Sequence, residues 1–86
     1  MATLRLPRML SDVANGAVST PVTGETVAEA LADLFHQKPG LRNHILDDSG
    51  SIRPHVSVFV DGTRADLSDS VGDRSQIRVL HAVSGG

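Results

Sequence analysis

The feature that most constrains the fold is one amphipathic segment, over residues 26–38, in a chain that otherwise consists of short strand-like stretches. Its apolar residues recur at helical spacing and form one face: Val27, Ala30, Leu31, Leu34 and Phe35. Thr26 and Glu29 have the spacing of a capping box, which predicts the helix start. Pro39 disfavours helix in the residue before it, so the helix should end near Lys38. A single amphipathic helix needs a sheet to cover.

The remaining pattern predicts the strands of that sheet. We expect strands at 3–6, 17–22, 56–60, 63–65 and 76–80, with a short helical turn at 41–46 and polar turns or loops at 47–50 and 67–73. The dipeptides Asn15-Gly16 and Asp61-Gly62 favour turns. Both faces of the segment 56–60 are apolar, so we expect it to be a central strand. The order β-β-α-β-β-β predicts an α+β fold, in which one helix packs on one face of a mixed sheet of four to five strands.

Composition narrows the possible partners. The 86 residues suffice for one domain, and the formal net charge of −2 lacks the basic footprint of a nucleic-acid-binding protein. The chain has no cysteine, and none of its four histidines (His36, His44, His55 and His81) is spaced as a metal-binding pair, so we expect no metal site. No signal peptide or membrane-length apolar run is present, so we expect a cytoplasmic protein that does not bind membranes. No catalytic motif is found, so we expect no enzyme activity.

The sequence closes with Val83-Ser84-Gly85-Gly86. Glycine has no Cβ, so such a tail can pass close to the walls of a narrow channel and present its carboxylate there. We therefore expect a domain over residues 1–80 and a flexible tail over 81–86. A frayed chain end is the alternative explanation, because chain termini are commonly small, polar and poorly ordered.

The order of elements and the tail together resemble the ubiquitin-like β-grasp sulfur carriers of the ThiS/MoaD type. The resemblance lies in the helix start Thr26-Val27-Ala28-Glu29-Ala30-Leu31, in Val56-Ser57-Val58-Phe59-Val60-Asp61-Gly62, and in the segment from Ile77 to Gly86. The stretch 39–50 is similar to the longer carriers that serve cysteine biosynthesis, and also to the small subunit of molybdopterin synthase.

The resemblance implies chemistry at the end of the tail. An E1-like adenylating enzyme would use ATP and Mg²⁺ to convert the Gly86 carboxylate into an acyl-adenylate, and a sulfur donor would then leave a thiocarboxylate on Gly86. Gly85, Ser84 and Val83 would thread the channel of that enzyme. The carrier itself would bind no cofactor. It would act as a monomer that serves the activating enzyme and a sulfur-accepting biosynthetic enzyme.

Carriers of this type dock through the sheet face from which the tail emerges. The candidate docking residues here are Leu80, Phe59, Val79 and Val83, with His81 as a further contact at the base of the tail. For Phe59 and Val79, a place in the core or on the ordinary sheet surface is the stronger explanation.

Two other functions stay open. The first is a ubiquitin-like modifier that is joined to target lysines through Gly86. Lys38, as the only lysine, leaves such a modifier little scope for self-linked chains. The second is a non-covalent β-grasp interaction domain whose terminal glycines have no role. The recipient of the sulfur, whether in cysteine, cofactor or secondary-metabolite synthesis, is not specified by the sequence.

Overall fold

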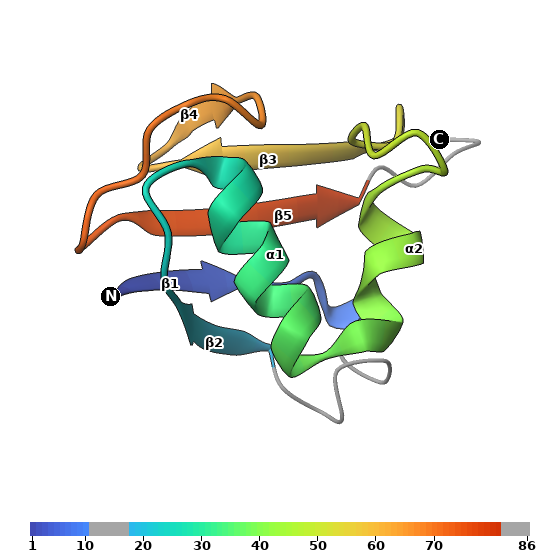
Figure 1. Cartoon of the computed structure of the whole chain (residues 1–86), viewed down its shortest axis with the longest axis horizontal. Coiled ribbons are helices and arrows are strands. Elements are labelled where there is room, and N and C mark those ends of the chain that lie inside the picture. The colour runs from blue at the N-terminus through green and yellow to red at the C-terminus, as the bar shows by residue number, and fades with distance from the viewer. Residues whose placement is uncertain (11–17, 82–86) are drawn as a thin grey trace.

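A computed structural model of the chain describes residues 1–10 and 18–81 and shows one mixed sheet covered on one side by helices (Figure 1). The elements are β1 (Ala2–Arg5), the 3-10 turn η1 (Arg8–Leu10), β2 (Ser19–Val22), α1 (Val27–Gln37), the 3-10 turn η2 (Pro39–Leu41), α2 (Arg42–Ile45), β3 (Val56–Val60), β4 (Thr63–Ala65) and β5 (Gln76–His81). The predicted α+β class, with five strands and one main helix, is confirmed.

The strand order is β2-β1-β5-β3-β4. β1 pairs with β5 in parallel, whereas the other three pairings are antiparallel. The expectation that segment 56–60 forms the central strand is only partly correct: β3 has a neighbour on each side, but β5 lies in the middle. The apolar pattern of segment 56–60 indicates that its side chains are buried, but it does not indicate which strands pair with each other.

Helix α1 is held at its start by the predicted cap. The hydroxyl of Thr26 accepts a hydrogen bond from the Glu29 backbone N–H at 3.2 Å. The Glu29 carboxylate does not close the box on Thr26, because it accepts instead from the backbone N–H of Glu25, one residue earlier, at 2.8 Å. The loop that follows β4 completes the cap, since its carbonyl groups at Leu67 and Asp69 accept from the first N–H groups of α1.

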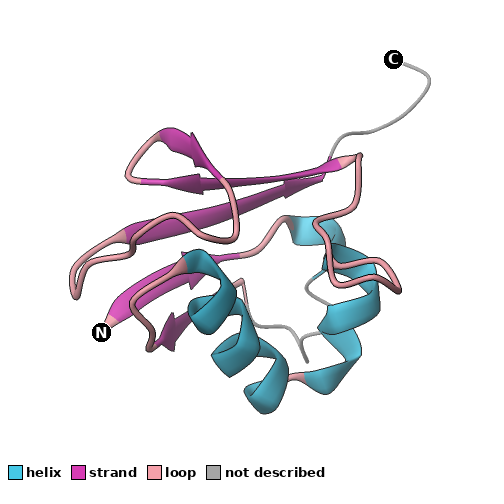
Figure 2. Cartoon of the chain, turned by 45° about the horizontal axis from the view of Figure 1, so that its top comes forward, coloured by secondary structure: helices cyan, strands magenta, loops and turns pink. Residues whose placement is uncertain are grey.

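The core lies between the sheet and the two helices, which sit on the same side of it (Figure 2). Fully buried side chains come from every layer: Leu4, Val22, Val58, Ile77 and Val79 from the sheet, and Leu31, Leu34, Leu41 and Ile45 from the helical side. The Asp61-Gly62 turn between β3 and β4 forms as predicted, and both of its residues have positive φ (51° and 86°). The opposite side of the sheet has no covering layer among the described residues.

Candidate functional site

The site that the sequence points to begins where β5 ends. β5 continues through His81, which pairs with Val56, so the strand is one residue longer than predicted and the tail begins after His81. Val83, Ser84, Gly85 and Gly86 lie outside the described residues. His81, the last residue that the structure describes, is therefore held in the sheet.

Two histidines mark this point. The ring of His55, just before β3, packs edge-on against the ring of His81, with centroids 4.5 Å apart and planes at 71°. The Nδ1 atom of His81 is buried and has no hydrogen-bond partner among the residues that the structure describes. His81 thus belongs to the packed base of the tail, and His55 is a neighbour that sequence spacing alone does not reveal.

The segment that carries His55 is itself held by a network of short hydrogen bonds. The Asp47 carboxylate accepts from the hydroxyl of Ser49 at 2.7 Å and from the backbone N–H groups of Ser49 and Ser51 at 2.9 and 3.0 Å. These bonds hold the pKa of Asp47 below its ordinary value, and the bond from the Ser49 hydroxyl contributes most. The Arg53 side chain donates to the Asn43 carbonyl at 2.7 Å and ties this segment to α2.

The strand register separates the predicted docking residues into two groups. Leu80 is 43% exposed and pairs with Ser57, on the side of the sheet that faces away from the helices. Phe59 is half-buried on the same side, opposite Arg78. Val79 faces the helices and is only 1% exposed, so it is a core residue and has to be removed from the docking set. His81 also lies on the helix-facing side, opposite the buried Val56.

We call the uncovered side of the sheet the open face. Its strand residues are Ser19 and Pro21 on β2, Thr3 and Arg5 on β1, Gln76, Arg78 and Leu80 on β5, Ser57 and Phe59 on β3, and Arg64 on β4. Four of them form one row across the sheet, because Arg5 pairs with Arg78, Arg78 with Phe59, and Phe59 with Arg64. The sequence predictions missed these arginines as a group. Alternation along each strand indicates that they face away from the core, but only the register places them side by side.

A shallow hollow of about 190 Å³ lies beside this row, between β4 and the start of β3. It is lined by Ile52, Arg53, Pro54, Val56, Ser57, Val58, Arg64, Ala65 and Asp66. Arg64 and Ser57 therefore border both the hollow and the open face.

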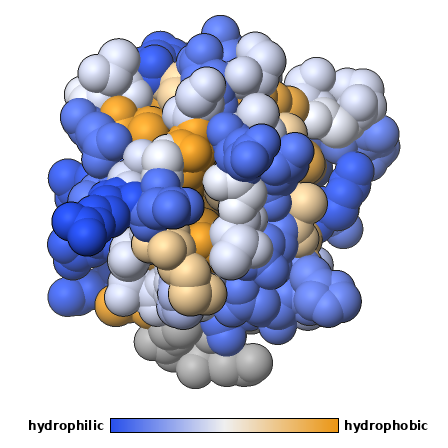
Figure 3. Space-filling view, turned by 60° about the vertical axis from the view of Figure 1, so that its left-hand side comes forward, coloured by the Kyte–Doolittle hydropathy of each residue, from blue (hydrophilic) through white to orange (hydrophobic). Residues whose placement is uncertain are grey.

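Other kinds of site find little support in the part of the chain that is described. Residues 1–10 and 18–81 contain no group of three or more side chains that could hold a metal ion, and no helix in these ranges has the length and apolarity needed to span a bilayer. The side of the molecule in Figure 3 is mostly hydrophilic, with narrow strips of hydrophobic residues between the polar ones. The end of β5 and the open face remain the best-defined candidate site.

Comparisons with known proteins agree with this assignment. The ThiS family model matches residues 5–86. Small archaeal modifier protein 1 of Haloferax volcanii is 30% identical over 79 residues, which cover 90% of this chain and 91% of the relative. Sulfur carrier protein CysO of Mycobacterium tuberculosis is 24% identical over 90 residues, with 98% and 97% of the two chains covered.

A solved structure supports the same fold. A chain of the Amycolatopsis orientalis BexX/CysO complex superposes with a TM-score of 0.92 at 23% identity, and the match covers 100% of both chains. The fold is thus the ubiquitin-like β-grasp. The relatives named above are a small modifier protein and a sulfur carrier protein. With a family model that matches nearly the whole sequence, this chain belongs to the ThiS family.

Proposed function

We propose that this protein is a sulfur carrier that holds sulfur as a thiocarboxylate on Gly86. In the first step, a Gly86 carboxylate oxygen attacks the α-phosphorus of ATP on an E1-like enzyme, and pyrophosphate leaves with Mg²⁺. In the second, the sulfur of a hydrosulfide equivalent attacks the carbonyl carbon, the bond to AMP breaks, and AMP departs. The carrier has no catalytic role of its own and works in the cytoplasm, where its partner finds ATP.

The position of β5 is the observation that carries this proposal. β5 lies between β1 and β3, and its pairing with β3 continues as far as His81, where the tail begins. Five residues follow His81 up to Gly86, which gives a reach of at most about 18 Å from the sheet. A tail anchored on the middle strand can enter an enzyme channel while the domain stays folded outside. Membership of the ThiS family supports the same role.

A second function is favoured by one specific observation. Small archaeal modifier protein 1, whose name describes a modifier, is 30% identical to this chain. In a modifier, a lysine amine of a target protein would attack the same acyl-adenylate or a derived thioester, and an amide bond to Gly86 would result. The two functions share the activation step and differ in the nucleophile that follows.

The recipient of the sulfur is a further part of the proposal. We favour a sulfur-accepting biosynthetic enzyme, with cysteine synthesis as the first candidate, because CysO is among the relatives. A role as the small subunit of molybdopterin synthase is the alternative within the same chemistry.

The intact mass of the protein, recovered without acid from the cells that make it, tests the proposal. We expect a mass gain equal to the replacement of one oxygen by sulfur, localised to Gly86 by fragmentation. A variant that lacks Gly85-Gly86 is the control and should show no gain. Adducts to other proteins through Gly86 would favour the modifier. An unmodified mass after incubation with cell extract, ATP and sulfide would contradict both functions.

A further inference from the structure

We propose that the open face is a docking surface for an acidic patch on the activating enzyme, and that Arg5, Arg64 and Arg78 are its main charged contacts. This inference rests on the proposed function and deepens it. The predicted docking surface was apolar, whereas the structure shows a row of arginines with Phe59 between two of them.

The first argument is the concentration of charge. The chain has a net charge of −2 and eight Lys and Arg residues, yet three of those eight lie in one row of the open face. None of the strand residues on the open face is a carboxylate. Neighbouring strands are about 4.8 Å apart, so the row from Arg5 to Arg64 covers about 14 Å. A compact positive field of this kind complements an acidic surface.

The second argument is that the arginine row lowers the folding stability of the domain itself. Arg5 and Arg78 are direct partners in adjacent strands, and like charges in that position disfavour folding. Their guanidinium groups make no hydrogen bond or ion pair within residues 1–10 and 18–81. Two acidic residues flank β4: the Asp61 carboxylate accepts from the backbone N–H of Gln76 at 2.8 Å, and Asp66 follows β4 and lines the hollow together with Arg64. Among the described residues, no hydrogen bond or ion pair of these guanidinium groups offsets the repulsion within the row.

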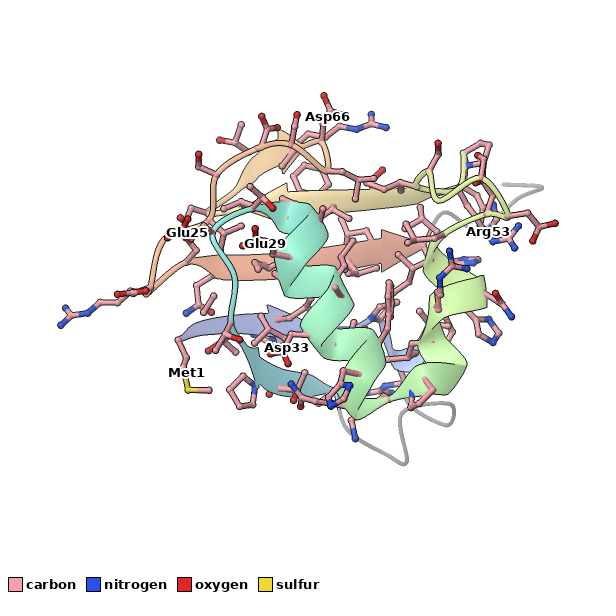
Figure 4. All side chains as sticks on the ribbon, in the orientation of Figure 1. Met1, Glu25, Glu29, Asp33, Arg53 and Asp66 are labelled. Atoms are coloured by element: carbon pink, nitrogen blue, oxygen red, sulfur yellow. The ribbon has the colours of Figure 1, made fainter. Side chains whose placement is uncertain are left out.

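The third argument is a cluster of carboxylates on the helix side of the sheet. The acidic residues Glu25, Glu29 and Asp33 lie along one edge of α1 and just before it (Figure 4). The arginine row lies on the other side of the sheet. An acidic partner would meet these carboxylates beside α1, whereas the charged strand residues of the open face are all arginines. This difference in charge between the two sides orients the domain as it approaches the enzyme. It brings the end of β5, on the same sheet, toward the enzyme.

The row also offers the contacts that an interface core needs. Phe59 is half-buried between Arg78 and Arg64, and the exposed Leu80 lies on the next row toward the tail. The hollow of about 190 Å³ beside Arg64 and Arg53, which Asp66 also lines, adjoins the row. Arginine suits this role because its planar guanidinium group binds carboxylates in a bidentate manner.

The test is ATP–pyrophosphate exchange by the adenylating enzyme of the same cells, with the carrier as the varied substrate. The face variant is R5E/R64E/R78E. The control is R8E/R42E/R74E, which changes three exposed arginines elsewhere and gives the same net charge. We expect the KM for the face variant to rise on the order of 10- to 100-fold with kcat unchanged, and that of the control to change by less than about 3-fold. Raising the salt concentration should raise the KM of the unchanged protein more than that of the face variant.

Several outcomes would overturn the inference. A face variant whose circular dichroism is unchanged and whose KM is within about 2-fold of the control would show that the row does not dock. If the face variant is unfolded, the neutral R5Q/R64Q/R78Q variant gives the same comparison. Binding of a poly-uridine strand through the row, with an unchanged KM, would assign the face to nucleic acid instead. Absence of exchange with the unchanged protein would refute the proposed function, and this inference with it.

Discussion

The close approach of Gly24 to helix α1 allows a sharp prediction for the Gly24→Ala variant. Gly24 lies between β2 and α1 with a φ of +151°, which side-chain-bearing residues rarely adopt. A Cβ atom here would lie 2.7 Å from the Ala30 backbone nitrogen and 2.7 Å from the Cβ of Glu29. These atoms belong to the first turns of α1, so the added methyl group has to displace the helix from the sheet.

The expected cost has two parts. Backbone strain at such a φ contributes about 1–3 kcal/mol, and overpacking against α1 contributes about 1–3 kcal/mol more. A total of about 2–6 kcal/mol is a large share of the roughly 4–13 kcal/mol expected for 86 residues. At about 4–8 °C per kcal/mol, the melting temperature should fall by at least about 8 °C.

The assay is urea unfolding followed by far-ultraviolet circular dichroism, because the chain has no tryptophan or tyrosine. The matched control is Gly50→Ala. Gly50 also has a positive φ, of +87°, but no heavy atom lies within 4 Å of the place that an added methyl group would take, so only strain of about 1–2 kcal/mol applies. A Gly24→Ala variant no less stable than Gly50→Ala would refute the role of the close approach.

Three further predictions concern the same domain. Thr26→Ala removes the acceptor for the Glu29 N–H and should lower the free energy of unfolding by about 1 kcal/mol, measured in urea against Thr26→Ser, which keeps the hydroxyl. Leu34→Ala opens a cavity at a fully buried position and should cost about 2–5 kcal/mol, and a loss below about 1 kcal/mol would contradict the packing described. At neutral pH, Asp47→Asn should lower the free energy of unfolding more than Asp48→Asn does. The pKa of Asp47 is lower in the folded state than its ordinary value of 3.8. The extra loss of stability is therefore fully present when the pH is above 3.8, and it disappears as the pH falls through the folded-state pKa. An excess that is independent of pH would refute the ionic role of Asp47.

Local features were predictable from sequence because their causes lie within a few residues. The spacing of Val27, Ala30, Leu31 and Leu34, the cap at Thr26 and the stop at Pro39 predict the observed helix to within a residue at its ends. The Asp61-Gly62 turn follows in the same way from residues that tolerate positive φ. The family was also predictable, because the order of these elements and the Gly-Gly tail resemble those of its members. The family comparison confirms that resemblance.

The arrangement of the strands was decided by tertiary structure alone. The parallel pairing of β1 with β5 joins segments from opposite ends of the sequence, and no local pattern encodes such a contact. That pairing puts β5 in the middle and places Arg5 beside Arg78. Side-chain alternation determines which residues share a face along one strand, whereas the register between strands determines which of them become neighbours. The sequence by itself therefore determined the α+β class, helix α1 with its cap and the candidate reactive end. The arginine row on the open face exists only because long-range hydrogen bonding aligns strands that are distant in the sequence.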